Sequence, residues 1–459
     1  METPGDVLLS GEAELYVEHL ELFDVKDIGS SRWTQQHERI EKLNIQAVVS
    51  ATAQSDEFIK EFFINHDKIR FLIHDLLTTE VWKEKIFSQI MEADYNPKTT
   101  FPLYMVLYHE ATVVNLLETI MYHRDSCESA DDAINDLVDY CYRKLCQLVS
   151  RNPDEDDIEE FVKGSQDLSA ASHVSSMEEL EKQEKKLNFD MCIKSLSLLR
   201  YVTDHQQSLP LSVLSRILNT HDLPNLLVQL VESPPWTHRI DGTLYKFVDS
   251  KWREISIEDQ FTLTKTEGQV WIALYHLLMQ PTCQEKYDLN SYRKNTILKL
   301  RSYLTPVLLD QLPVLGDMQR YLEHLSMMDP PPAKKDLVLE QVPEIRDNLL
   351  RRHEGKWKKM AKQQMKFFFN PSDAEIREQA RRWADTYNFD VLESLISDPP
   401  KCAVCGKEAT KRCSRCQNEW YCRRECQVDH WARHKKACDL MQESQSKVEP
   451  QAQLVETTS

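Results

Sequence analysis

Glycine is scarce in this chain: only 9 of its 459 residues are glycine, against about 7% in an average protein. No two of these glycines are close enough to form a loop that cradles a phosphate, so the Rossmann and P-loop fingerprints are absent. Few positions are therefore suited to positive-φ turns, and the abundant Leu, Glu and Lys favour long helices. The composition predicts a mostly α-helical protein with no nucleotide-binding loop of these two kinds.

Recognisable catalytic motifs are also missing. There is no G-x-S-x-G nucleophile elbow, and the stretch HEATV, which begins at His109, has Val113 where a zinc protease needs its second histidine. We therefore expect His109 and Glu110 to lie on the surface of a helix, with no metal. The sequence predicts a binding protein and not an enzyme.

Positive charge is under-represented as well, since 56 Lys and Arg stand against 74 Asp and Glu, a formal net charge of -18. Such a chain is repelled by nucleic acid and by anionic membranes, so proteins are the expected partners and nucleic acid is not. The first residues, METPGDVLLSGEAEL, lack the basic start of a signal peptide, and no run of about 18 apolar residues suggests a transmembrane segment. These features predict a soluble cytoplasmic protein with reduced cysteines.

The apolar residues that are present recur at helical spacing. Ile69, Leu72, Ile73, Leu76 and Leu77 fall on one face of a helix, and similar stripes follow at 103–121 and 134–148. Helices of this kind joined by short turns predict an irregular helical array or one like the armadillo and HEAT solenoids. Such arrays present extended surfaces to other proteins.

Changes in composition predict the domain organisation. We expect an N-terminal helical region at 1–150, a flexible linker or insert, acidic and Ser-rich, at 151–187, and a second helical region at 188–395. Asp241 and Gly242, between β-branched and aromatic residues, indicate a short hairpin near 240–255 within the second region. A small cysteine-rich module at 402–438 and a disordered tail at 439–459 complete the chain.

Seven of the 12 cysteines lie between residues 402 and 438, with the spacing C-x2-C-x7-C-x2-C-x5-C-x3-C-x7-H-x3-C. Disulfides are unfavourable in a cytosolic protein, and eight thiolate and imidazole ligands complete two tetrahedral zinc sites. Because protein ligands fill every position, both Zn2+ ions are predicted to be structural. The predicted ligands are Cys402, Cys405, Cys413, Cys416, Cys422, Cys426, His434 and Cys438.

This ligand pattern resembles that of the MYND-type zinc fingers. The resemblance implies a cross-brace, in which Cys402, Cys405, Cys422 and Cys426 hold one ion and Cys413, Cys416, His434 and Cys438 hold the other. His430 competes with His434 as a ligand, but His434 keeps the H-x3-C spacing. MYND fingers bind proline-containing peptides, and the resemblance places Gln427 and Trp431 at positions used for that contact. Trp431 has an alternative role, filling the small core of the finger.

The whole chain, with its start GDVLLSGEAELYVEHLELF and its single C-terminal finger, resembles a family of MYND-containing factors for the preassembly of axonemal dynein arms. The resemblance implies an adaptor or co-chaperone needed for motile cilia. Its implied partners are a leucine-rich-repeat dynein-assembly factor, Hsp90-type chaperones and dynein chains. The implied location is the cytoplasm, with centriolar satellites or dynein-assembly foci as more specific sites.

Two other classes of protein also carry MYND fingers. A transcriptional corepressor adaptor would recruit proline-containing peptides through the finger, and it is the stronger alternative. Lysine methyltransferases combine the finger with a SET domain, but there the finger interrupts a β-rich catalytic domain. Here the finger follows a long region of helical pattern, which disfavours the enzyme.

Overall fold

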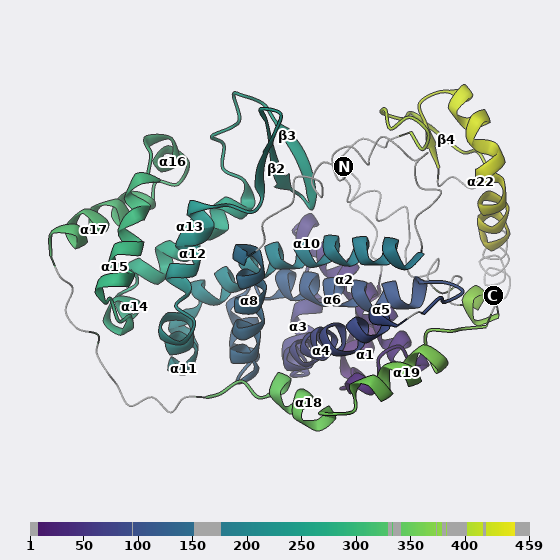
Figure 1. The fold of residues 1–459 in the computed structure, drawn as a ribbon, viewed down its shortest axis with the longest axis horizontal. Coiled ribbons are helices and arrows are strands. Elements are labelled where there is room, and N and C mark those ends of the chain that lie inside the picture. The colour runs from purple at the N-terminus through teal and green to yellow at the C-terminus, as the bar shows by residue number, and fades with distance from the viewer. Residues whose placement is uncertain are drawn as a thin grey trace, which may run out of the picture. The chain divides into compact units, whose positions relative to one another are not determined.

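The computed structural model describes residues 8–93, 95–150, 176–328, 333, 341–372, 374–378, 382, 402–415 and 419–445. The chain divides into two compact units, and the described residues from Leu8 to Pro371 belong to one of them, which we call the helical body. The described residues from Cys402 onward belong to the other and are called the finger. Figure 1 shows the elements of each.

In the first part of the body, the described secondary structure consists of helices, two of them short 3-10 or π segments. Its elements are α1 (Ser10–Glu18), η1 (Val25–Asp27), α2 (Ser31–Ala53), α3 (Phe58–Asn65), α4 (Ile69–Trp82), η2 (Lys83–Phe87), α5 (Ser88–Glu92), α6 (Phe101–Ile120), α7 (Arg124–Ser129) and α8 (Ala133–Ser150).

The second part of the body adds a small sheet to further helices. Its elements are α10 (Ser176–Asp204), η3 (Gln206–Ser208), α11 (Leu211–Ser215), η4 (Arg216–Thr220), α12 (Leu223–Glu232), β1 (Thr237–Ile240), β2 (Thr243–Val248), β3 (Lys251–Ile255), α13 (Lys265–Met279), α14 (Pro281–Lys286), α15 (Ser291–Leu298), η5 (Lys299–Ser302), α16 (Pro306–Gln311), α17 (Leu315–Met327), α18 (Ile345–His353) and α19 (Trp357–Phe367).

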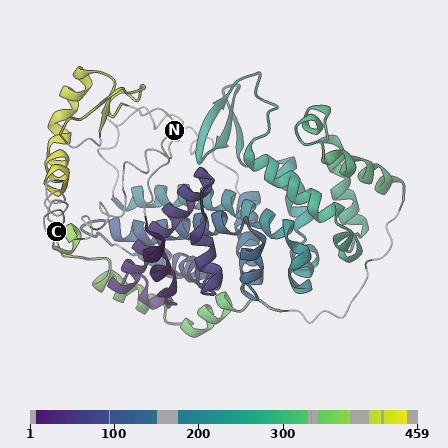
Figure 2. The same ribbon diagram turned by 180° about the vertical axis from the view of Figure 1, so that it is seen from behind.

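Helix α6 is the central helix of the first part. It contacts α2, α4 and α10, so most of its circumference is buried, and α10 continues the packing to α8 and α13. The purple N-terminal helices lie behind this layer in Figure 1 and in front of it in Figure 2. The predicted mostly α-helical fold is confirmed, and because the described helices range from 5 to 29 residues the array is irregular.

Local sequence sets several of these boundaries. The Ser30 hydroxyl accepts a hydrogen bond from the Trp33 amide at 3.3 Å and so caps the start of α2. Thr264 and Glu267 form a reciprocal capping box at the start of α13. Such caps satisfy amide groups that have no partner within the helix, so they fix where each helix begins.

A three-stranded antiparallel sheet interrupts the helices, in the order β1-β2-β3. Two-residue turns join the strands, and both residues of each turn have positive φ: Asp241 (48°) and Gly242 (83°), then Asp249 (51°) and Ser250 (59°). Turns of this kind match the right-handed twist of the strands they join. The segment where the sequence indicates a hairpin thus holds three strands.

The last helices of the body pack against its beginning. The Trp82 indole N–H donates to the Gln364 side-chain oxygen at 2.8 Å, and the Gln364 amide donates to the Val25 carbonyl at 2.9 Å. Gly29 has a φ of 86°, and a Cβ there would lie 2.9 Å from the ring of Phe369. Residues more than 300 positions apart therefore meet in one apolar cluster.

Three predicted domain boundaries are wrong. Helix α10 begins at Ser176, so residues 176–187 are not part of a flexible linker, and the rest of that linker, 151–175, lies outside the described residues. The regions 1–150 and 188–395 are not separate, because one apolar core runs from Leu8 to Leu325. Helix α22 (Arg424–Gln445) extends through 439–445, which we expected to be disordered; residues 446–459 are outside the described part.

The expectation that His109 and Glu110 lie on a helix surface is also wrong. They are 1% and 0% exposed, because helices surround α6. His109 Nε2 lies 2.9 Å from Asp75 Oδ2, and His109 Nδ1 lies 2.8 Å from His37 Nδ1. The half-motif belongs to a polar network inside the body and does not form a protease-like metal site.

Glu110 joins a second buried network. Its carboxylate lies 2.8 Å from the ammonium groups of both Lys83 and Lys144, and it accepts a hydrogen bond from the Tyr140 hydroxyl at 2.8 Å. Burial raises the carboxyl pKa, but the two ammonium groups outweigh burial and lower the pKa of Glu110 to about 2. This ion cluster connects η2, α6 and α8.

Among the described residues, no helix combines the length and the apolar character that a bilayer span requires.

Candidate metal centre

The finger begins with a short turn that brings its first two cysteines together. The Gly406 amide donates to the Cys402 carbonyl at 2.9 Å, and the Cys402 amide donates to the Lys407 carbonyl at 2.7 Å. Gly406 has a φ of 68°, a conformation that glycine adopts without strain. The C-x2-C spacing and this glycine therefore form the first half of a metal site.

A two-stranded ribbon forms the centre of the finger. Strand β4 (Lys411–Arg412) pairs with β5 (Trp420–Tyr421), and the Cys413 amide donates to the Glu419 carbonyl at 2.8 Å. Cys413 directly follows β4 and Cys422 directly follows β5. Because the strands are antiparallel, the two cysteines lie at opposite ends of the ribbon, and each joins a different ligand set. Cys416, between the two strands, lies outside the described residues.

Helix α22 carries the remaining ligands. Cys426, His434 and Cys438 are separated by multiples of four residues, so they lie along one face of this helix. Cys426 is 3% exposed, His434 3% and Cys438 0%. One helix therefore supplies ligands to both metal sites.

The first site is formed by Cys402, Cys405, Cys422 and Cys426, whose sulfur atoms all lie within 4.8 Å of one another. The separation is 3.4 Å between the sulfurs of Cys405 and Cys422, 3.7 Å between those of Cys422 and Cys426, and 4.0 Å between those of Cys426 and Cys405. Tetrahedral zinc with Zn–S bonds of about 2.3 Å places its sulfur ligands about 3.8 Å apart. These distances fit a zinc site in which every ligand is a cysteine thiolate.

The second site includes Cys413, His434 and Cys438 among the described residues. The sulfurs of Cys413 and Cys438 are 3.9 Å apart, and His434 Nε2 lies 3.4 Å from Cys413 Sγ. Tetrahedral zinc requires nitrogen–sulfur separations of about 3.6 Å. The three groups therefore fit zinc, and the cross-brace is evident because the ligands of the two sites alternate along the chain.

The chemistry of the donors also suits zinc. Burial raises the pKa of the Cys402 thiol, but backbone hydrogen bonds from Cys422, Val404 and Cys405 outweigh it and lower that pKa to about 6. The neighbouring thiols of the same cluster raise the pKa of Cys422 to about 12, with the Cys405 contact as the largest cause. Crowded thiols of this kind ionise together only when a cation balances their charge, and thiolate is the form that binds metal. Zinc held this way supplies no catalytic Lewis acid; it replaces an apolar core, and the predicted Zn2+ cofactors are structural.

The structure distinguishes the two candidate histidines. His430 is not part of either ligand cluster; its Nδ1 lies 3.0 Å from the Tyr421 hydroxyl. The rings of His430 and His434 are stacked with their centroids 5.6 Å apart. His434 is therefore the ligand, and His430 supports the ligand face from one turn earlier in α22.

The two predicted partner-binding residues, Gln427 and Trp431, lie on α22 and are both half-buried. The Trp431 ring packs against the finger's core, 6.0 Å from the His434 ring, and the Arg415 guanidinium lies 5.7 Å from its centroid. Trp431 thus contributes to packing. Its predicted contact with a partner, and that of Gln427, remain predictions.

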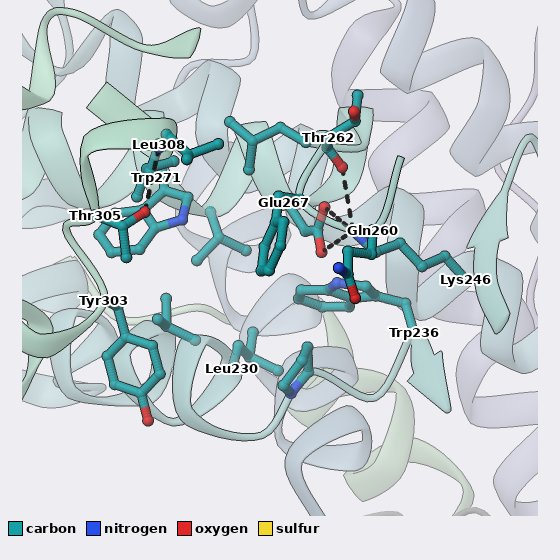
Figure 3. A pocket seen from close by; sticks show the side chains of 16 residues that line it. Leu230, Trp236, Lys246, Gln260, Thr262, Glu267, Trp271, Tyr303, Thr305 and Leu308 are labelled. Atoms are coloured by element: carbon teal, nitrogen blue, oxygen red, sulfur yellow. Dashed lines mark hydrogen bonds and ion pairs between the residues drawn. The ribbon is translucent and has the colours of Figure 1, made fainter. Parts of the chain in front are cut away.

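Sequence reasoning missed an apolar pocket in the body, between the end of α12, the sheet, α13 and α16. Its lining, which includes Trp236, comes from segments between Leu230 and Leu308, and no short motif marks them (Figure 3). The sequence signal nearest to the pocket is the group of aromatic and β-branched residues around Asp241 and Gly242. That group predicts a hairpin, but it does not predict a pocket beside it.

The fold and the two ligand sets define a class: a mostly helical protein with a MYND-type zinc finger. The family model of the MYND finger matches residues 402–438. The chain is also similar, over nearly its whole length, to the zinc finger MYND domain-containing protein 10 homolog of Drosophila melanogaster. The two are 31% identical over 456 residues, which cover 93% of this chain and 98% of that relative.

At this identity and coverage, the chain belongs to the family of zinc finger MYND domain-containing protein 10. Shorter similarities, of 47% and 48% identity, link it to ubiquitin carboxyl-terminal hydrolases 19 and 17 of Arabidopsis thaliana. They cover 10% and 9% of this chain and only 7% and 6% of those enzymes, so they carry no argument for hydrolase activity. No solved structure matches the chain.

Proposed function

We propose that this protein is a non-enzymatic cytoplasmic adaptor, or co-chaperone, for the preassembly of axonemal dynein arms. The observation that carries the proposal is the similarity to the Drosophila zinc finger MYND domain-containing protein 10 homolog. This similarity covers 98% of that relative's length and includes both the helical body and the finger. The dynein role itself comes from the resemblance of the whole chain to a family of dynein-arm assembly factors. The four-cysteine site supports a binding module, because its protein ligands fill all four positions, and the predicted ligand Cys416 would close the second site in the same way.

The proposed partners are a leucine-rich-repeat dynein-assembly factor, Hsp90-type chaperones and dynein chains, bound through the helical body and the finger. The proposed location is the cytoplasm, including centriolar satellites or dynein-assembly foci. The strongly acidic character of the chain, -18 overall, supports protein partners over nucleic acid.

Deleting the gene in ciliated cells tests the proposal. We expect normal levels of dynein heavy-chain transcripts, with heavy chains that fail to co-sediment in assembled complexes and become unstable. The alternative, a corepressor-type adaptor, predicts altered transcript levels and normal assembly of the heavy chains that are made. That second result would overturn the proposed role.

Re-expression of finger variants tests the partner-binding residues. Trp431→Ala and Gln427→Ala should reduce capture of the partners while keeping two zinc ions per chain. Glu425→Ala is the control, since Glu425 is exposed at the start of the same helix. A Trp431→Ala finger that loses zinc would assign Trp431 to the core alone, and unchanged capture by both variants would place the binding surface elsewhere.

A further inference from the structure

Helix α19 carries a local excess of positive charge. From Lys356 to Phe367 the chain reads KWKKMAKQQMKF, with five lysines and no Asp or Glu. With α18 included, the segment 345–369 has eight Lys and Arg against two Asp and Glu, a formal charge of +6. Because the whole chain carries -18, the remaining residues together carry -24. A positive surface therefore lies on a protein that is otherwise strongly negative.

One face of α19 fixes this helix to the body. Met360, Ala361 and Gln364 are buried, and the helix contacts α5 and η2. Just beyond its end, the Phe369 carbonyl accepts a hydrogen bond from the Tyr95 hydroxyl at 2.7 Å. Figures 1 and 2 show α19 along one edge of the helical body. The helix is thus held in place with its opposite face toward solvent.

That opposite face presents four lysines, which are all exposed and, with Gln363 and Phe367, line an open hollow of about 570 Å3. We call them the lysine face: Lys358, Lys359, Lys362 and Lys366. In the described part of the chain, none of the four forms an ion pair. Exposed lysines elsewhere in the body, such as Lys265 and Lys299, each lie beside a glutamate. The lysine face therefore holds positive charge that no described carboxylate balances.

The chemistry and spacing of the lysine face favour carboxylates along a peptide. A lysine ammonium is a point charge without the planar fork by which arginine grips a phosphate, and α19 contains no arginine. Lys358, Lys362 and Lys366 are four residues apart, about 6 Å along the helix axis. Carboxylates at every second residue of an extended peptide recur at about 6.6 Å, which nearly matches this spacing.

The charge of the surrounding protein limits the size of the anion. DNA, RNA and an anionic membrane extend far beyond one helix, so they would also meet the residues that together carry -24 and be repelled. A short peptide contacts α19 alone. Phe367 is 66% exposed, and its ring centroid lies 5.0 Å from the Lys366 ammonium, so an apolar side chain of the peptide gains a contact there.

We propose that the lysine face of α19 binds a short acidic peptide segment of a partner protein. Carboxylates at alternate residues of the segment pair with the ammonium groups, and an apolar residue at its end packs on Phe367. The lysine face belongs to the helical body and not to the finger. The proposal does not depend on the ciliary role, so each can fail without the other.

A synthetic peptide tests the proposal: a fluorescein-labelled peptide with four glutamates at alternate positions and a terminal leucine. Its binding to the full-length, zinc-loaded protein is measured by fluorescence anisotropy. The same peptide with glutamine in place of glutamate should bind about tenfold more weakly. Binding of the acidic peptide should also weaken as salt rises from about 50 to 300 mM, because salt screens exposed charges.

Paired variants locate the binding site. Lys358→Glu with Lys362→Glu reverses two charges of the lysine face and should weaken peptide binding about tenfold. Lys265→Glu with Lys299→Glu is the matched control, because it changes the net charge equally on α13 and η5, and it should bind normally. Phe367→Ser should weaken binding about threefold. Circular dichroism checks that every variant folds.

Four outcomes would overturn the proposal. The first is equal binding of the glutamate and glutamine peptides. The second is equal weakening by the two double variants, which would show a response to net charge alone. The third is tighter binding of single-stranded DNA or phosphatidylserine vesicles than of the peptide. The fourth is peptide binding that appears only when the acidic stretch 152–160 is deleted, which would assign the lysine face to the chain's own segment.

Discussion

The helical body and the finger are stabilised by different means. In the body, apolar side chains form two large clusters, one with members from Leu8 to Leu325 and one that joins the last helices to the first, and Glu110 lies in a buried ion cluster. In the finger, the buried cluster consists mainly of the metal ligands themselves, together with Ala409 and Tyr421. A segment this short cannot bury enough apolar surface to fold alone, so metal bonds take the place of a core.

This difference shows where each unit is vulnerable. The body should tolerate metal removal but not the loss of a buried charge partner, because an uncompensated buried charge is costly. The finger should behave in the opposite way. The predictions below test this contrast, beginning with the largest expected effect.

Chelation should separate the two units most clearly. We expect two zinc ions per chain by elemental analysis, and each site should contribute about 10–16 kcal/mol of apparent binding free energy. Removing zinc should therefore unfold the finger and leave most of the helical circular dichroism of the body intact. A metal content near one per chain, or loss of the body's helices on chelation, would contradict the contrast.

A cysteine substitution refines this test. Cys413→Ser should lose one ion and destabilise the whole finger, because the two sites alternate along the chain. Cys146→Ser is the control, since Cys146 lies half-buried in the body and in neither ligand cluster. It should retain both ions.

Glu110→Gln should be the most damaging of the single changes considered in the body. It leaves Lys83 and Lys144 without the carboxylate that lies 2.8 Å from each of their ammonium groups. We expect the free energy of unfolding, measured in urea, to fall by about 3–5 kcal/mol, with zinc content unchanged. Exposed Glu61→Gln is the control and should change it by less than about 0.5 kcal/mol. Equal urea midpoints for the two variants would show that the ion cluster does not stabilise the body.

Acid should act on the body through the same carboxylate. The folded pKa of Glu110, about 2, is lower than its ordinary value of 4.5. The ionised Glu110 carboxylate therefore stabilises the folded body fully above about pH 4.5, and this stabilisation is lost as the pH falls toward 2. The stability difference between the unmodified protein and Glu110→Gln should narrow over this interval in urea titrations. A difference that stays constant from pH 6 to pH 2 would refute this assignment.

His430→Ala should have the smallest effect and should distinguish a support from a ligand. It removes the contact between His430 Nδ1 and the Tyr421 hydroxyl, which is 3.0 Å long, and should cost the finger about 1 kcal/mol. Both zinc ions should remain. His434→Ala, four residues further along the same helix, should lose one ion, and the opposite pattern of metal loss would exchange the two assignments.

Several features of the finger were accessible from sequence because they are local. Ligands such as Cys402 and Cys405, or Cys422 and Cys426, are close in the chain, so covalent geometry and one helical turn already bring each pair together. Helical periodicity is also a local signal. The apolar stripe that begins at Ile69 is buried, as its spacing predicts. The division of the ligands into two alternating sites came from family resemblance, and the two clusters of ligand atoms agree with it for seven of the eight residues. The eighth, Cys416, stays a prediction.

Tertiary structure alone decided the features that join distant segments. His109 and Glu110 are buried because helices from other parts of the chain surround α6, and the Trp236 pocket forms only where the sheet meets α13 and α16. Periodicity reports one apolar face of a helix, but it does not show how many neighbours will cover the remaining faces. Burial, and with it the pKa of Glu110, depends on that packing.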